Sequence, residues 1–131
     1  MIKLTPELFV LKYIMLFDGL PARYNILFRV LYDIKKNPKY SKQLKEFKFW
    51  GSPVAPFCEA LDEGISNLMF SNIVYYDNRT KEIKQKEAFL SDHLLDEIKL
   101  YENSVGEGAF ESLCKEVHHY INELKIKEDL E

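Results

Sequence analysis

Three histidines are the side chains of this chain best suited to metal binding or to general acid–base catalysis: His93, His118 and His119. Adjacent residues on a helix point in directions about 100° apart, so His118 and His119 cannot hold one metal ion without distortion. The sequence contains neither an HExxH spacing nor a phosphate-binding glycine loop. We therefore predict no metal site, no cofactor and no enzymatic activity.

Two cysteines could serve as nucleophiles, metal ligands or disulfide partners. Cys58 and Cys114 lie far apart in the sequence, without a CxxC spacing and without a companion group of histidines. Free cysteines are among the most buried residues, and unpaired thiols persist in reducing compartments. We therefore predict that both thiols are structural and that the protein is cytoplasmic.

The apolar stretch from Leu8 to Phe17 is the segment of the sequence most similar to a membrane helix or a signal peptide. It is interrupted by Lys12, and it is shorter than the roughly 20 residues that a membrane-spanning helix needs. No small-residue cleavage pattern follows it before Asp18. We therefore expect no membrane association.

The charges are divided unevenly along the 131 residues. Residues 1–58 carry ten Lys and Arg against four Asp and Glu, whereas residues 59–131 carry eight against seventeen. Within the basic half, the positive charges concentrate between Arg23 and Lys48. This region could contact phosphate groups or an acidic partner, or it could be a solvated surface.

Helix signals at the amino terminus indicate the first two elements. Thr5 is followed by Pro6 and an acidic residue, which is the pattern of a capped helix start, and we expect this helix to end at Asp18. A second helix is predicted from Pro21 to Asn37, and we expect the two to pack as an antiparallel pair. Ser41 is predicted to cap a short helical turn that follows.

The middle of the chain combines a helical pattern with strand patterns. A helix is predicted over Pro53–Phe70 with Ser52 as its cap, because apolar residues recur along one face. Residues 73–76 and 80–86, joined by turn residues, predict a β-hairpin. Residues 47–50, FKFW, are expected to add a third strand.

The carboxy-terminal part is predicted to be helical. One helix is expected to begin at Ser91, and glycines 106 and 108 separate it from a last helix. The apolar seam of that helix, Phe110 to Leu124, has heptad-like spacing. It could pack on the rest of the chain or mediate a homodimer.

These elements predict a single domain over residues 1–131. The expected fold is mainly α with a small antiparallel β-hairpin or three-stranded sheet. A winged-helix-like core is expected over residues 5–90, a helical extension over 91–126, and an acidic, frayed tail over 127–131.

The segment FWGSPVAPFCEAL resembles the signature of the Panacea-domain family of antitoxin-like proteins. LFRVLYDIKKN resembles the leucine-rich helix before that signature, and LDEGISNLMFSNIVYY resembles the helix that leads into the hairpin. The sequence departs from the pattern by placing Ser52 between Gly51 and Pro53. The resemblance implies a non-enzymatic regulator that binds another protein, typically a toxin encoded beside it.

The central predicted helix also favours contact with a protein. In a DNA-reading winged helix, the helix before the wing enters the major groove, but this one carries Glu59, Asp62 and Glu63 and no Lys or Arg. Carboxylates there would repel phosphates. The aromatic residues Phe47, Phe49 and Trp50 could all be buried in the core. Strand alternation could instead place Trp50 and Lys48 on the face opposite Phe47 and Phe49, which would leave Trp50 as an exposed anchor. The predicted partner-binding residues are therefore Trp50, Lys48, Glu59, Asp62 and Glu63.

DNA binding through a basic wing is the alternative hypothesis. The hairpin carries several basic residues, and further lysines lie near the end of the second helix. Contact with the DNA backbone or minor groove would use both sets. The residues assigned to this alternative are Lys35, Lys36, Lys39, Asn78, Arg79, Lys81, Lys84 and Lys86.

Overall fold

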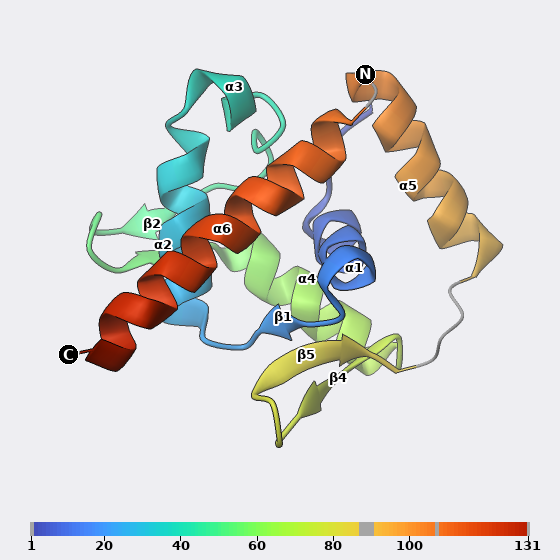
Figure 1. Ribbon diagram of the computed structural model, residues 1–131. Coiled ribbons are helices and arrows are strands. Elements are labelled where there is room, and N and C mark those ends of the chain that lie inside the picture. The colour runs from blue at the N-terminus through green and yellow to red at the C-terminus, as the bar shows by residue number, and fades with distance from the viewer. Residues whose placement is uncertain (1, 87–90, 107, 131) are drawn as a thin grey trace.

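The computed structural model describes residues 2–86, 91–106 and 108–130 (Figure 1). Its helices are α1 (Pro6–Phe17), α2 (Tyr24–Lys35), α3 (Pro38–Ser41), α4 (Glu59–Phe70), α5 (Asp92–Val105) and α6 (Ala109–Leu130). Its strands are β1 (Leu20–Pro21), β2 (Trp50–Gly51), β3 (Pro56–Phe57), β4 (Val74–Asp77) and β5 (Glu82–Gln85). One antiparallel sheet has the order β1–β5–β4, and β2 and β3 form a separate antiparallel pair. The expected class, mainly α with small antiparallel sheets, is confirmed.

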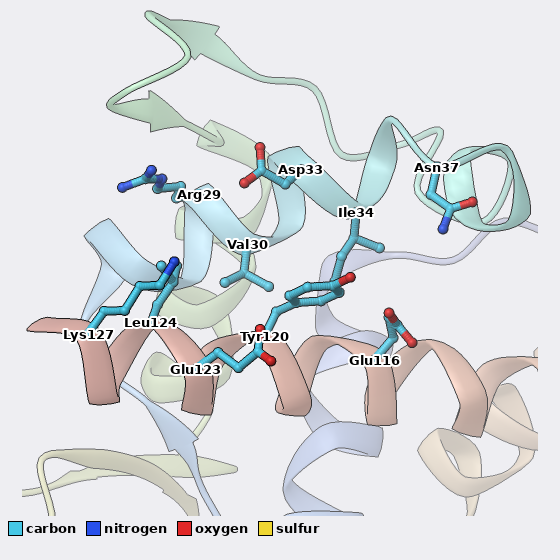
Figure 2. A pocket seen from close by; sticks show the side chains of 10 residues that line it. All are labelled: Arg29, Val30, Asp33, Ile34, Asn37, Glu116, Tyr120, Glu123, Leu124 and Lys127. Carbon is cyan, nitrogen blue, oxygen red and sulfur yellow. The ribbon is translucent and has the colours of Figure 1, made fainter.

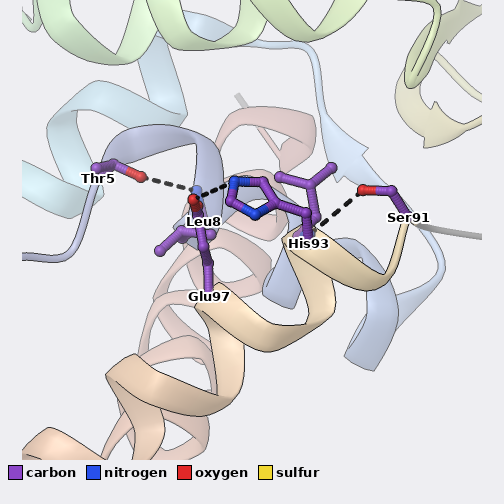
Figure 3. Close-up of polar contacts among 6 residues, drawn as sticks. Thr5, Leu8, Ser91, His93 and Glu97 are labelled. Atoms are coloured by element: carbon purple, nitrogen blue, oxygen red, sulfur yellow. Dashed lines mark hydrogen bonds and ion pairs between the residues drawn. The ribbon is translucent and has the colours of Figure 1, made fainter.

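Side-chain caps fix two of the predicted helix starts (Figure 3). The Leu8 amide donates to Thr5 Oγ1 at 3.3 Å, and the Leu94 amide donates to Ser91 Oγ at 3.3 Å. Pro6 occupies the first turn of α1, where its missing N–H has no carbonyl to reach. The starts of α1 and α5 therefore lie where the cap residues predicted them.

Two other helix starts differ from the prediction. α2 begins at Tyr24 instead of Pro21, because Pro21 belongs to β1. The four-residue α3 begins at Pro38, and its cap is Asn37, whose Oδ1 accepts from the Lys39 amide at 3.0 Å. Ser41, the predicted cap, is instead the last residue of α3.

The predicted hairpin is confirmed as β4 and β5, with Val74 opposite Gln85 and Tyr76 opposite Ile83. Its third strand is β1, in which Leu20 pairs with Ile83. β1 lies between α1 and α2, and α4 leads into the hairpin. This order of helices and strands is the one expected of a winged-helix-like core, in which β4–β5 would be the wing and α4 would be the recognition helix.

The prediction that residues 47–50 form the third strand was wrong. Of these residues only Trp50 is in a strand, and β2 pairs with β3 instead of with the hairpin. The competing strand, Leu20–Pro21, is too short to give an alternating pattern. Pro21 is tolerated there because β1 is an edge strand.

The predicted start of α4 was also wrong. The helix begins at Glu59, and residues 52–55 form a turn in which the Ala55 amide donates to Ser52 Oγ at 3.2 Å. A helix starting at Pro53 would need an amide donor at position 56, where Pro56 has none. Pro56 also disfavours a helical conformation at the residue before it.

α1 and α2 do not form the predicted antiparallel pair. α2 packs mainly against α6, and α1 packs mainly against α4 (Figure 1). α6 therefore crosses over the amino-terminal helices, and its residues Phe110, Leu113, Cys114, Val117 and Ile121 are almost fully buried in the core. The apolar seam of the last helix is thus used within the chain.

The carboxy-terminal tail differs from the expected frayed segment, because α6 continues to Leu130. Its last turns consist largely of Lys, Glu and Leu, which have high helix propensity. Glu131, the last residue of the predicted tail, lies outside the described residues. A homodimer through α6 would use a face other than the buried seam, such as that of the exposed Ile126.

Candidate functional site

The β2–β3 hairpin exposes several large apolar side chains. Trp50 is 64% exposed, Phe57 is 43% exposed, and Val54 in the turn is 79% exposed. Trp50 and Phe57 are register partners across the two strands. The Phe57 ring also packs edge-on against Phe28 of α2, with ring centroids 5.3 Å apart. The hairpin is therefore anchored on α2 while its apolar side chains remain in contact with solvent.

The segment before β2 alternates as the sequence predicts, although it is not a strand. Phe47 is fully buried and Phe49 is half-buried, whereas Lys48 and Trp50 are exposed. Lys35 Nζ donates to the Phe47 carbonyl at 2.7 Å, which ties this segment to α2. The alternation leaves Trp50 and Lys48 as the residues that face outward.

α4 presents an exposed stripe that contains acidic residues and ends in an aromatic residue. Glu59, Glu63, Ser66 and Phe70 recur at spacings that place them along one face, and Phe70 is 90% exposed. The third predicted carboxylate, Asp62, is half-buried. Burial raises the pKa of the Tyr24 phenol, and the negative charge of Asp62 raises it further. Of the three predicted carboxylates, Glu59 and Glu63 are therefore the ones fully available to a partner.

Phe70 was not among the predicted site residues. Its position two residues after the buried Leu68 turns its side chain about 200° away around the helix, which is the signal that could have identified it. The twelve residues of α4 span about 18 Å, so Trp50 and Phe70 adjoin opposite ends of the helix.

The amino-terminal residues of the DNA-binding alternative are partly engaged within the chain. Lys35 holds the Phe47 carbonyl, as described above. Lys36 Nζ lies 4.3 Å from the ring centroid of Tyr32, and Lys39 Nζ lies 5.3 Å from that of Tyr40. Lys36 and Lys39 remain exposed.

The residues of the β4–β5 hairpin assigned to the same alternative fall into two groups. Lys84 Nζ lies 3.8 Å from Asp77 Oδ2, and Lys86 Nζ donates to Asn72 Oδ1 at 3.3 Å. The exposed residues at the tip are Asn78, Arg79 and Lys81. The tip thus supplies the basic groups that are best placed to reach a phosphate.

The structure does not bring these two basic sets together. Figure 1 shows α3 and the end of α2 at the top of the molecule and the β4–β5 hairpin at the bottom. A single short contact with DNA therefore cannot include both Lys39 and Arg79.

The histidines lie in separate environments. His93 Nε2 lies 2.8 Å from Glu97 Oε1 on α5, and His119 Nε2 lies 3.1 Å from Glu123 Oε1 on α6 (Figure 3 shows the first pair). His118 is half-buried and shares a hydrogen bond with the Tyr13 hydroxyl at 2.9 Å. Among the described residues, no group of three or more His, Cys, Asp and Glu side chains is arranged to hold a metal ion.

The two cysteines are free, buried thiols. Burial raises the pKa of both Cys58 and Cys114, so each stays protonated at neutral pH. A protonated thiol is a poor nucleophile and a poor metal ligand. The structural role predicted for both residues agrees with these environments.

A groove of about 350 Å³ lies between side chains of α2 and α6 (Figure 2). Its apolar part is formed by Val30, Ile34, Tyr120 and Leu124, and Figure 2 shows the Tyr120 side chain reaching from α6 toward α2. Both positive and negative groups line its edge, including Arg29 and Glu123. The sequence analysis did not identify this groove, because its walls come from helices that are distant in the sequence.

No family model, curated protein or solved structure matches this chain. Among the residues that the structure describes, no helix combines the length and the apolar character needed to cross a membrane.

Proposed function

We propose that the protein is a small cytoplasmic, non-enzymatic regulator that binds another protein, in the manner of an antitoxin. The proposed contact surface consists of the β2–β3 hairpin and the exposed stripe of α4. Its residues are Lys48, Trp50, Val54, Phe57, Glu59, Glu63 and Phe70. Asp62 is left out of this surface because it is half-buried.

The exposure of Trp50 is the observation that carries the proposal. Tryptophan is the residue type most enriched among those that dominate binding energy at protein interfaces. Here it lies beside Phe57 on a hairpin that is held in place by Phe28, so the apolar group is already positioned. A preorganised anchor loses less conformational entropy when a partner binds.

The charge of α4 supports a protein partner over DNA. In the position of a recognition helix, α4 presents Glu59 and Glu63 to solvent and carries no basic residue. Phosphate binding gains affinity from neutralisation by Lys and Arg, which this helix cannot supply. A partner with an apolar pocket and basic groups around it would complement the surface.

The test is a binding measurement with the purified product of the gene beside this one, the partner class implied by the family resemblance. Biolayer interferometry should detect a complex whose affinity changes little between low and high salt, because apolar contact dominates. Trp50→Ala should weaken it by at least about tenfold. Leu100→Ala, which removes an exposed apolar side chain from α5, is the matched control. Equal affinity of the two variants would contradict the proposed surface.

A winged-helix regulator that contacts DNA through its wing is the second candidate. The exposed Arg79 and Lys81 at the tip of β4–β5 are the observation that favours it. Binding of random duplex DNA should then fall steeply with salt, and Arg79→Gln with Lys81→Gln should reduce the salt dependence. An absence of DNA binding at low salt would exclude this candidate.

A further inference from the structure

A second cavity, of about 450 Å³, lies where the first residues of the chain meet the segment after α3 and the junction of α5 and α6. Lys3, Lys39, Lys42 and Lys45 line it, and we refer to it as the lysine-ringed cavity. Its volume is in the range of sites that hold small ligands. None of the partner-binding residues proposed above lines this cavity.

The charge around the lysine-ringed cavity is strongly one-sided. Glu46 is the acidic residue among the lining groups, and its Oε1 lies 3.8 Å from Lys3 Nζ. Lys39, Lys42 and Lys45 are all exposed, and none of them lies within ion-pair distance of a carboxylate of the described residues. Like charges held around one cavity repel one another, and an anion placed between them would relieve that repulsion.

Several of the residues that line the cavity are held in place by hydrogen bonds. The Tyr101 hydroxyl donates to Gln43 Oε1 at 3.0 Å, and Gln43 Nε2 donates to the Ala109 carbonyl at 3.4 Å. Ser104 Oγ donates to the Tyr101 carbonyl at 2.7 Å. These bonds join the segment after α3 to α5 and α6, so the positions of the surrounding lysines rest on a fixed frame.

We propose that the lysine-ringed cavity binds a small polyanion that carries two or more phosphate groups. Lysine acts as a point charge toward phosphate, and several lysines around one cavity favour a ligand with several negative charges over one with a single charge. The Gln43 amide has a second N–H that can donate to a phosphate oxygen. The ligand class is therefore an oligophosphate or a nucleoside polyphosphate.

Isothermal titration calorimetry with the full chain tests this site, with tripolyphosphate as the probe and inorganic phosphate in a second arm. Tripolyphosphate should bind with one-to-one stoichiometry and at least about tenfold more tightly than phosphate. The variant Lys42→Gln with Lys45→Gln should weaken tripolyphosphate binding by about tenfold or more. Both lysines are exposed, so the fold should tolerate the change.

The matched control removes the same charge elsewhere. Lys99 and Lys115 are exposed on α5 and α6 and lie outside the cavity, so Lys99→Gln with Lys115→Gln should change the affinity less than about twofold. Equal losses in the two pairs would mean that only the net charge matters and would overturn the site. Failure of tripolyphosphate to saturate the protein would also overturn it. Binding of a random duplex DNA without binding of tripolyphosphate would replace it with a nucleic-acid surface.

Discussion

The two hairpins of this protein differ in how many of their groups find contact partners within the chain. In the β4–β5 turn, Asp77 Oδ1 accepts from the Arg79 amide at 2.9 Å, and the Asp77 carbonyl accepts from the Lys81 amide at 2.8 Å. Lys84 adds an ion pair to the same aspartate. The backbone of this turn is therefore held by contacts within the chain.

The β2–β3 hairpin has the opposite character. Its turn is closed by the Ala55 amide, which donates to the Ser52 carbonyl at 3.1 Å, but its exposed side chains are mainly apolar. Exposure of apolar side chains to water is unfavourable. No segment of the described chain covers Trp50 or Val54. The comparison teaches that the turn of the wing-like hairpin is held by polar contacts within the chain, whereas the β2–β3 hairpin leaves its large apolar side chains uncovered.

The largest expected effect is on stability, and it compares a buried with an exposed aromatic residue in the segment that leads into and begins β2. Phe47→Ala should lower the free energy of unfolding by about 3 to 5 kcal/mol, because it leaves a cavity beside Phe9 in the core. Trp50→Ala should cost less than about 1 kcal/mol, because its ring is mostly in solvent. Urea titration of both variants measures this difference. Similar losses would mean that Trp50 is a structural residue.

The next effect concerns binding and compares one aromatic residue from each hairpin. Trp50→Ala should weaken the complex with the protein partner by at least about tenfold. Tyr75→Ala, which removes an exposed ring from β4, should change the affinity less than about twofold. Surface plasmon resonance with both variants checks the prediction. A greater loss for Tyr75→Ala would move the contact surface to the wing.

A smaller effect is expected from His118, which joins α6 to α1. Its ring stacks on Phe17 with centroids 3.9 Å apart and bonds to Tyr13, while Asn122 Nδ2 lies 3.2 Å from its Nε2. Desolvation by burial lowers the pKa of His118, and Lys125 lowers it further, whereas Glu82 opposes the shift. Folding therefore favours the neutral ring. The contribution of His118 to the free energy of unfolding is fully present above the unfolded-state pKa of about 6.5, and it decreases as the pH is lowered below that value.

The variant His118→Gln should unfold more easily at pH 7.5 but should lose less stability than the native protein as the pH falls. Thermal unfolding across this pH range measures both effects. His119→Gln is the control, because that neighbouring ring pairs with Glu123 and does not contact Tyr13. An unchanged pH slope in His118→Gln would contradict the role assigned to this ring.

The smallest expected effect is a difference between the two hairpins in how acid changes the hydrogen-exchange protection of their turns. The Arg79 amide holds the pKa of Asp77 below its usual value. The contribution of the Asp77 carboxylate to the free energy of unfolding is therefore present above the unfolded-state pKa of about 3.9, and it is lost as the pH falls through the folded-state pKa. Hydrogen-exchange protection of the Lys81 amide should therefore decline in acid more than that of the Ala55 amide. Equal declines would show that the Asp77 carboxylate does not hold the wing turn.

Local signals in the sequence predicted several elements correctly. Thr5 and Ser91 identified helix starts because a cap requires only residues close in the sequence. The β4–β5 hairpin was predicted for the same reason, since its strands are joined by a short turn. The third strand was missed because Leu20 meets Ile83 through a contact between distant segments, which has no local pattern.

The candidate surface was predictable in part. The sequence left open whether Trp50 is buried in the core or exposed by alternation; the structure has it exposed, and the expected strand pairing was wrong. The acidic residues of α4 were visible in the sequence, but the half-burial of Asp62 depends on how the helix packs in the fold. The lysine-ringed cavity could not be predicted, because its walls come from three separate parts of the chain.

Hydrogen–deuterium exchange of the complex with the protein encoded beside this one tests the central claim most directly. The account predicts increased protection across residues 50–57 and on α4, with no change at the tip of β4–β5. Protection confined to residues 77–82, with residues 50–57 exchanging as in the free protein, would contradict it.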